Sequence, residues 1–236
     1  EVFENTLSAF ERAIEIGADS IELDVNVSKD NRLVVVHDPV LISGDDATPL
    51  TLRNLSLQEI QALDSRIPVL EDVFLMVKAS SLPRSRDIIL DIEIKRDALC
   101  PEYSPSSDEF AKLVLDSVEK HRECARTVLR SFDVSVLRSL RKLNRAVSLA
   151  LISETDSKSN DEIIDEIKPE IFAPLFSVVT KALVKRLHEK GVRVFPWTVN
   201  KKKDWERMLQ IGVDGITTDD PRGLIAFLCD RGQAVF

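Results

Sequence analysis

Two acidic residues stand two positions apart in a stretch that has the pattern of a β-strand. Residues 20–27 read Ser-Ile-Glu-Leu-Asp-Val-Asn-Val, so apolar and polar side chains alternate with a period of two. Glu22 and Asp24 therefore project from the same face of the strand. Charges on a strand buried in an α/β sheet are costly unless they are paired or bind a metal. The spacing favours a functional site over a solvent-exposed strand face.

A turn after this strand adds a histidine to the same place. Residues 28–31, Ser-Lys-Asp-Asn, separate the first strand from a second β-rich run at 33–36. Asp and Asn tolerate the backbone conformations of a tight turn, so the segment predicts a β-hairpin. Antiparallel pairing about Asp30 places His37 across from Leu23 or Asp24. A lone histidine is usually structural, but here it accompanies two carboxylates.

The acidic pattern recurs at residues 88–95, which read Ile-Ile-Leu-Asp-Ile-Glu-Ile-Lys. Asp91, Glu93 and Lys95 share one face of this second strand. If the two strands are parallel neighbours, Glu22, Asp24 and Glu93 converge, and three carboxylates cannot all ionise cheaply without a cation. An oxygen-only donor set suits Mg²⁺ or Ca²⁺ better than zinc.

Such a group of side chains is suited to phosphoryl chemistry. A hard metal ion and the positive charge of Lys95 can stabilise charge that develops on a phosphoryl group. His37 is the natural proton donor or acceptor near neutral pH. Trp197, in the run Phe-Pro-Trp-Thr-Val-Asn, either lines a substrate pocket or fills apolar core.

Further along the chain, strands and helices alternate regularly. The sequence predicts a helix after Asn5 or Thr6 that ends near Gly17, a surface loop at 41–54, a helix at 56–63 with a capping box, and a helix that begins at Pro68. It further predicts strands at 127–131, 148–152, 171–173, 193–199 and 215–217, and helices at 108–122, 135–143, 161–167, 181–190, 203–210 and 221–228, the last capped by Asp219.

Seven parallel strands linked by helices indicate an α/β fold. One more strand upstream of Glu1 completes the eight of a (β/α)8 TIM-type barrel with a β-hairpin after its second strand. No Gly-rich phosphate loop supports an open doubly wound sheet. We expect residues 1–236 to form a single barrel domain.

Composition limits the classes of function. A net charge of −8 argues against nucleic-acid binding through phosphate contacts. No apolar run reaches the length of a transmembrane segment. Cys100, Cys124 and Cys229 are widely spaced and show no metal-ligand pattern, so free thiols and a cytoplasmic location are expected. The basic runs near Arg141 and at 201–203 fit solvated helix faces better than a lipid-headgroup patch.

Several motifs, in order, resemble the glycerophosphodiester phosphodiesterase family. They are Glu4-Asn5-Thr6, Ile21-Glu22-Leu23-Asp24-Val25, Val36-His37-Asp38, Glu93-Ile94-Lys95, Ser131-Phe132-Asp133, Trp197-Thr198-Val199-Asn200 and residues 212–221. Each motif alone is weak, but the ordered combination spans nearly the whole chain and is specific.

The resemblance implies a TIM-type barrel that hydrolyses glycerophosphodiesters to glycerol 3-phosphate and an alcohol, with a place in lipid and glycerol metabolism. It implies that the metal ligands are Glu22, Asp24 and Glu93, and that His37 is one of two catalytic histidines. It further implies that Lys95 contacts the phosphate and that Trp197 lines the substrate pocket. The implied partners are a divalent metal, Mg²⁺ or Ca²⁺, and a small-molecule diester.

The sequence departs from the family pattern in several places, and two of them bear on function. The family's His-Arg-Gly signature, which carries the other catalytic histidine, falls before Glu1, so the sequence is either trimmed at its front or lacks half of the acid–base pair. The loop after His37 lacks the usual Arg and Thr pattern. Alternatives are a lysophospholipase D-like or phosphoinositide-type phosphodiesterase, for which the loop at 41–52 offers little apolar surface, and a catalytically silent barrel that binds metal or phosphodiesters.

Overall fold

The computed structural model describes residues 2–43 and 48–232, and its chain forms two compact units. The first unit spans Glu1–Val147 and the second spans Ser148–Phe236. All of the predicted site residues except Trp197 belong to the first unit.

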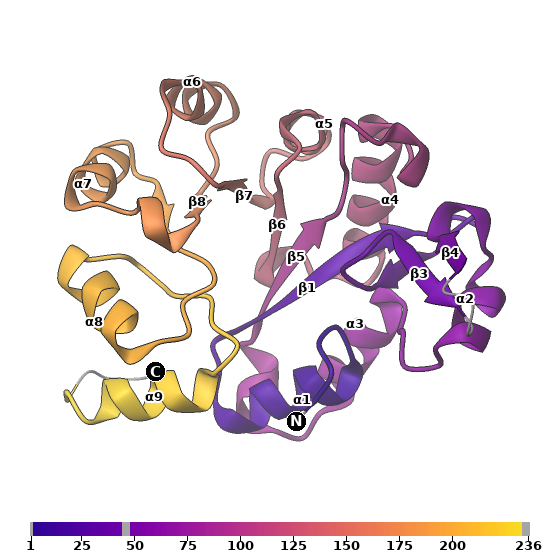
Figure 1. The fold of residues 1–236 in the computed structure, drawn as a ribbon, viewed down its shortest axis with the longest axis horizontal. Coiled ribbons are helices and arrows are strands. Elements are labelled where there is room, and N and C mark those ends of the chain that lie inside the picture. Colours follow the sequence, from indigo (N-terminus) through magenta and orange to yellow (C-terminus); the bar gives the residue numbers. More distant parts are fainter. Residues whose placement is uncertain (1, 44–47, 233–236) are drawn as a thin grey trace. The chain divides into compact units, whose positions relative to one another are not determined.

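The first unit is built on parallel strands that carry the acidic motifs. Strands β1 (Ser20–Val27), β5 (Ile89–Ile94) and β6 (Thr127–Ser131) run side by side in this order (Figure 1). Strand β2 (Leu33–Val35) pairs antiparallel with the other edge of β1. Their apolar side chains are buried, as expected of strands covered on both faces. The charged side chains of β1 and β5 are therefore held in a largely buried setting.

The predicted hairpin after β1 is confirmed. Val25 pairs with Val35 and Val27 with Leu33, so continuing the register places position 37 opposite position 23. The amide N–H of Val36 also donates to the Asp24 carbonyl at 3.0 Å. Asn31 adopts a positive φ of 57° in the turn, a conformation that asparagine tolerates.

Helix α1 (Leu7–Ile16) begins and ends as the sequence predicts. Thr6 is the N-cap residue, and its hydroxyl accepts a hydrogen bond from the amide of Ala9. Gly17 ends the helix in the left-handed conformation at φ 99°. Asn5, the other predicted cap, instead binds Asp24 on β1.

The prediction of a loop at 41–54 is wrong. Strands β3 (Val40–Ser43) and β4 (Thr48–Thr51) form a small antiparallel sheet, followed by the 3-10 helix η1 (Leu52–Asn54). Pro49 pairs with Ile42 in this two-stranded sheet, where proline is tolerated at an edge. The predicted turn residues Gly44, Asp45 and Asp46 lie outside the described residues.

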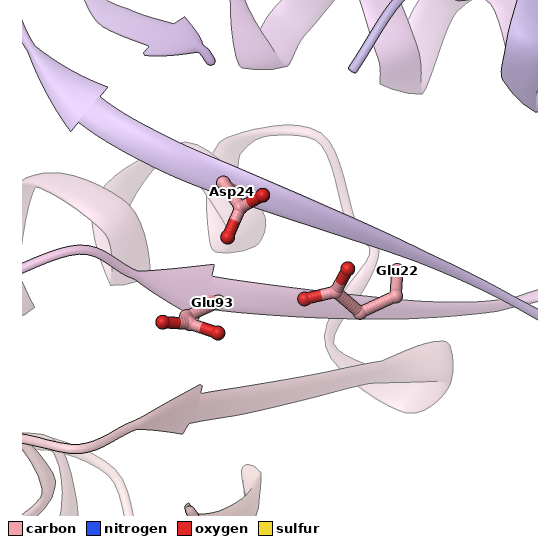
Figure 2. Close-up of side chains that lie close together, drawn as sticks. All are labelled: Glu22, Asp24 and Glu93. Atoms are coloured by element: carbon pink, nitrogen blue, oxygen red, sulfur yellow. The ribbon is translucent and has the colours of Figure 1, made fainter. Parts of the chain in front are cut away.

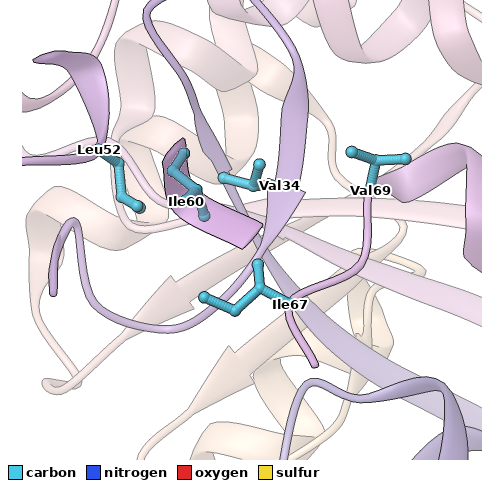
Figure 3. Packing of buried hydrophobic residues seen from close by; sticks show 5 residues of the cluster. All are labelled: Val34, Leu52, Ile60, Ile67 and Val69. Atoms are coloured by element: carbon cyan, nitrogen blue, oxygen red, sulfur yellow. The ribbon is translucent and has the colours of Figure 1, made fainter. Parts of the chain in front are cut away.

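An apolar cluster packs the segment that follows the β3–β4 sheet against strand β2 of the β1–β2 hairpin. Val34 of β2, Leu52 and Ile60 pack with Ile67 and Val69, and all five are buried (Figure 3). Ile60 belongs to α2 (Leu57–Leu63), whose capping box of Ser56 and Glu59 is confirmed. The cluster fixes β2, the strand that leads to His37.

Helices cover the strands of the first unit. Helix α3 (Leu70–Ala79) begins after Val69 rather than at Pro68, because Asp72 accepts a hydrogen bond from the Val69 amide. Helices α4 (Ser107–Lys120) and α5 (Val134–Leu143) lie against each other (Figure 1). The connecting 3-10 helices are η2 (Pro83–Arg86), η3 (Pro101–Tyr103) and η4 (Cys124–Arg126).

The second unit repeats the strand–helix alternation. Strands β7 (Ser148–Ser153), β8 (Ile171–Pro174) and β9 (Arg193–Val194) are parallel. The helices of this unit are α6 (Lys158–Ile167), η5 (Phe176–Val178), α7 (Lys181–Glu189), α8 (Lys202–Ile211) and α9 (Pro221–Cys229).

Two predictions for the second unit are corrected. Residues 215–217 do not form a strand, although the amide of Val199 donates to the Thr217 carbonyl at 2.9 Å. A segment this short, with glycine at its start, does not sustain a regular ladder. The cap of α9 is Asp220, which accepts from the Gly223 amide, whereas Asp219 accepts from the Asn200 side chain.

Candidate active site

Three carboxylates meet on the neighbouring strands β1 and β5. Asp24 pairs with Glu93 in the parallel register, and Glu22 stands two residues earlier on the same face of β1. One oxygen from each of the three side chains lies within 4.8 Å of the other two (Figure 2). The predicted convergence of Glu22, Asp24 and Glu93 is thus present in the structure.

Burial makes two of these carboxylates, Glu22 and Glu93, reluctant to ionise. Asp24 and Glu93 are buried, and Glu22 is partly so. Desolvation, together with the charges of neighbouring carboxylates, raises the pKa of Glu22 well above its usual value, although Arg130 acts in the opposite direction. Desolvation likewise raises the pKa of Glu93, against the influence of Lys95.

Lys95 lies directly against the cluster. Its Nζ is 3.1 Å from Glu93 Oε1 and 3.5 Å from Asp24 Oδ1. Burial disfavours the ammonium form, but the Glu93 and Asp24 carboxylates outweigh that effect and raise the pKa of Lys95. The side chain therefore supplies a fixed positive charge at neutral pH.

A second cation, Arg130 on β6, was not singled out in the sequence. Its guanidinium is buried and donates to Asp91 Oδ2 at 2.8 Å. Arg130 pairs in register with Glu93, which places it beside the cluster. The available signal was a single charged residue in the predicted buried strand Thr-Val-Leu-Arg-Ser, because a buried arginine requires an anionic partner.

The donor set suits a hard divalent cation. Among the described residues at this point, four carboxylates (Glu22, Asp24, Asp91 and Glu93) face two cations, so full ionisation leaves two uncompensated negative charges. An ion of charge two with oxygen ligands restores the balance, as Mg²⁺ and Ca²⁺ do. Without such an ion, only protons can neutralise the excess negative charge, and burial together with this excess charge raises the pKa values of Glu22 and Glu93.

His37 extends the site outward. Its Nε2 lies 3.2 Å from Lys95 Nζ, and its Nδ1 lies 2.8 Å from Asp38 Oδ1. The Asp38 contact orients the ring, and more than half of the His37 side chain is exposed to solvent. An imidazole held beside a buried carboxylate cluster can exchange protons with a bound substrate.

Asn5 has a role that differs from its prediction. Its side-chain amide donates to Asp24 Oδ2 at 2.8 Å, and its Oδ1 accepts the Asp24 amide N–H at 3.0 Å. The sequence marked Asn5 as a possible helix cap and as part of a family motif, but its bond to Asp24 was not predicted because a partner nineteen positions away has no local signal.

The other predicted or excluded residues have contacts of their own. Trp197 is in the second unit, where its indole N–H donates to the Ala173 carbonyl at 2.8 Å. His188 on α7 pairs with Asp214. His121, at the C-terminal end of α4, packs edge-on against Phe74 of α3.

The model of the glycerophosphoryl diester phosphodiesterase family matches residues 1–222. The chain belongs to this family. A glycerophosphodiester phosphodiesterase from Caldanaerobacter subterraneus is 33% identical over 94% of this chain and 90% of its own length. The family relationship makes the chain a phosphodiester hydrolase.

Solved structures of the family share its fold. A putative glycerophosphodiester phosphodiesterase from Galdieria sulphuraria matches 97% of this chain and 92% of its own chain, with 26% identity and a TM-score of 0.85. An Oleispira antarctica phosphodiesterase in complex with the product sn-glycerol-3-phosphate matches 96% of this chain and 91% of its own, with 18% identity and a TM-score of 0.83. These matches confirm the predicted fold class, a TIM-type α/β barrel.

Within the described ranges, helices long and apolar enough for a membrane crossing are absent from this phosphodiesterase.

Proposed function

We propose that this chain is a metal-dependent glycerophosphodiester phosphodiesterase that releases glycerol 3-phosphate and an alcohol. The observation that carries the proposal is the convergence of Glu22, Asp24 and Glu93 with oxygens within 4.8 Å of one another, beside Lys95 and His37. Each residue was predicted from the sequence, and together they have the chemistry that hydrolysis of a phosphodiester requires.

The three carboxylates hold the metal in this proposal. When bound, Mg²⁺ or Ca²⁺ supplies Lewis-acid polarisation of the phosphoryl oxygens. Lys95 lies against Glu93 and Asp24, so its ammonium sits at the edge of the same site and can neutralise a further phosphoryl oxygen. This charge is worth most in the transition state, where negative charge on the phosphoryl group is greatest.

His37 takes part in proton transfer. Hydrolysis forms a P–O bond to an attacking oxygen, which loses a proton, and breaks the P–O bond to the alcohol, which gains one. His37 serves one of these two transfers, and Asp38 Oδ1 holds its Nδ1 so that Nε2 points to the site. The attacking oxygen is that of water or of the neighbouring glycerol hydroxyl. In the second case the first displacement forms a cyclic glycerol phosphate, and water must open this ring in a second displacement to give glycerol 3-phosphate.

The substrate class follows from the family and from this site. The Caldanaerobacter relative is named a glycerophosphodiester phosphodiesterase, and the Oleispira protein holds sn-glycerol-3-phosphate. Both names support a substrate that carries a glycerol phosphate group. In this proposal, the metal and Lys95 contact its phosphate. Trp197 as a wall of the substrate pocket stays a prediction from the resemblance.

A diester that carries an acyl chain is the second candidate substrate. Leu99, in the loop after β5, is 90% exposed, and Phe132 is exposed directly after β6. These apolar side chains follow strands whose ends carry site residues. A lysophospholipid with a choline headgroup therefore belongs in the substrate panel beside glycerophosphocholine.

The first test is release of glycerol 3-phosphate from glycerophosphocholine and glycerophosphoethanolamine. We expect release to stop with chelator and to return with Mg²⁺ or Ca²⁺, because the carboxylates need a cation to bind the phosphate. Glu93→Ala should reduce turnover at least 100-fold, the scale of a lost group that stabilises transition-state charge. Glu206→Ala, at an exposed ion pair, is the matched control.

Each contrary result has a distinct meaning. Activity that persists with chelator, or with Glu93→Ala and restored metal, contradicts the metal assignment. Release of choline from the lysophospholipid, with formation of the acylated glycerol phosphate, and no release from the glycerophosphodiesters favours the acyl-chain candidate. A folded protein that binds metal but releases no product from any diester contradicts the enzymatic proposal and favours a silent binding barrel.

A further inference from the structure

Asn5 makes two hydrogen bonds to one proposed metal ligand. Its Nδ2 donates to Asp24 Oδ2 at 2.8 Å, and its Oδ1 accepts the Asp24 amide N–H at 3.0 Å. The two bonds join a residue before α1 to the middle of β1. A side-chain amide can form this pair because it carries a donor and an acceptor at once.

The contact determines which oxygen of Asp24 is available. Asn5 occupies Oδ2, and the other oxygen, Oδ1, is the atom 3.5 Å from Lys95 Nζ. The carboxylate is thereby held with one oxygen toward the cation side of the site. The other oxygen, Oδ2, is bound by the neutral side chain of Asn5, which adds no charge to the cluster.

The backbone of Asn5 is arranged for this contact rather than for helix capping. Asn5 has a φ of 54°, in the left-handed region that asparagine and glycine enter most readily. The next residue, Thr6, caps α1 through its hydroxyl and also donates to the Phe3 carbonyl at 2.7 Å. Adjacent residues thus divide two tasks, with Thr6 starting the helix and Asn5 binding Asp24.

We propose that Asn5 is a positioning residue that orients Asp24 for divalent-metal binding. The inference rests on the metal site of the proposed function and extends it to a residue outside the ligand set. Partners that hydrogen-bond to a metal ligand fix its orientation, and their loss typically weakens metal affinity about 10- to 100-fold. Asn5 acts through Asp24 and needs no contact with the substrate.

The test compares direct metal binding by Asn5→Gly with that of its neighbour Thr6→Ala. Glycine keeps the left-handed backbone and removes both hydrogen bonds to Asp24. Isothermal titration with Mg²⁺ and with Ca²⁺, without substrate, should show a Kd raised about 10-fold or more for Asn5→Gly. Thr6→Ala should keep the wild-type Kd and lower the Tm, since it loses a helix cap.

A second variant guards against a folding defect. Asn5→Ser keeps a polar side chain that is too short to reach both groups of Asp24, and we expect the same loss of metal affinity. Wild-type affinity in both Asn5 variants overturns the inference while leaving the proposed metal site intact. An equal loss in Thr6→Ala also overturns it, because a general weakening of this turn then explains the effect. Absence of metal binding by the wild-type chain overturns the proposed metal site and the inference together.

Discussion

At the scale of single residues, Lys95 has two functions that oppose each other. Its ammonium stabilises Glu93 and Asp24 at 3.1 and 3.5 Å, and the same charge repels a divalent cation bound by those carboxylates. Lys95 lies at the edge of the cluster and contacts His37. We therefore expect its ammonium to contact the substrate. Turnover and metal affinity should therefore respond in opposite directions when this charge is removed.

Lys95→Met tests that separation. We expect kcat to fall about 10²- to 10³-fold, because a charge that stabilises the phosphoryl transition state is lost. Metal should bind at least as tightly as in the wild type, since a competing cation is gone. Lys112→Met, at an exposed pair with Asp116, is the control. Near-normal kcat in Lys95→Met contradicts its role toward the phosphate, and weaker metal binding contradicts the repulsion argument.

The residues found from the sequence are those whose signal is local. Glu22, Asp24 and Glu93 stand out because alternation puts charge on buried strands, and His37 follows from hairpin geometry. Arg130 and Asn5 were missed because their partners, Asp91 and Asp24, are distant in sequence. Hydrogen bonds of this kind depend on the strand register, which a single sequence does not specify.

At the scale of secondary-structure elements, the turn between α4 and β6 is fixed by a buried carboxylate. Glu123 is 2% exposed, pairs with Arg126, and lies 3.1 Å from Lys78 Nζ on α3. Its carbonyl accepts the hydroxyl of Thr127 at 2.9 Å, at the start of β6. The pairing ties together α3, α4 and the strand that carries Arg130.

Glu123→Gln should destabilise the protein in a pH-dependent way. Although burial opposes ionisation, hydrogen bonds from Arg126 and Lys78 hold the pKa of Glu123 below its usual value. A depressed pKa contributes stability that is present above the unfolded-state pKa and is lost as the pH falls through the folded-state pKa. We expect a loss of about 3 kcal/mol at neutral pH, measured by urea unfolding.

The difference between wild type and Glu123→Gln should shrink as the pH is lowered through that range. Glu206→Gln, at an exposed pair with Arg231, should cost less than about 1 kcal/mol at any pH. A Glu123→Gln deficit that does not change with pH attributes the loss to packing and contradicts the ion-pair account.

Element prediction succeeded where periodicity was strong and failed where tertiary packing decided the conformation. The helices with amphipathic patterns and the apolar strands appear where expected, with ends shifted by one to three residues. The β3–β4 hairpin was missed because turn-forming residues obscured a pattern stabilised by packing around Leu52 and Ile60. The shortening at 193–199 and the missing strand at 215–217 reflect ladders too short to be regular.

At the scale of the whole molecule, the repeated strand–helix alternation was sufficient to predict the barrel class, which the solved relatives confirm. All three proposed metal ligands belong to the first unit, and Trp197 belongs to the second. The single-domain organisation and the cytoplasmic location stay predictions. The free cysteines Cys100, Cys124 and Cys229 agree with the thiol prediction.

Without metal, the acidic cluster should lower the free energy of unfolding, and bound metal should raise it. Burial and mutual repulsion raise the pKa values of Glu22 and Glu93, so stability is lost as the pH rises from their unfolded-state pKa values up to the raised folded-state values. Saturating metal at about 100 times its Kd should add about 2.7 kcal/mol. For a chain of this size that corresponds to a Tm rise of about 5–10 °C.

Glu93→Gln separates the two effects by scanning calorimetry with and without metal. Without metal, the variant should melt above the wild type near neutral pH, because one buried like charge is removed, and the gain should fade as the pH is lowered and Glu93 of the wild type takes up a proton. With metal, the variant should show little of the wild-type rise in Tm. Glu11→Gln, on the exposed face of α1, should behave as the wild type in both conditions. If Glu93→Gln without metal melts below the wild type, the claim that the buried charge of Glu93 lowers stability is wrong. If the variant keeps the full metal-induced rise in Tm, Glu93 is not a metal ligand.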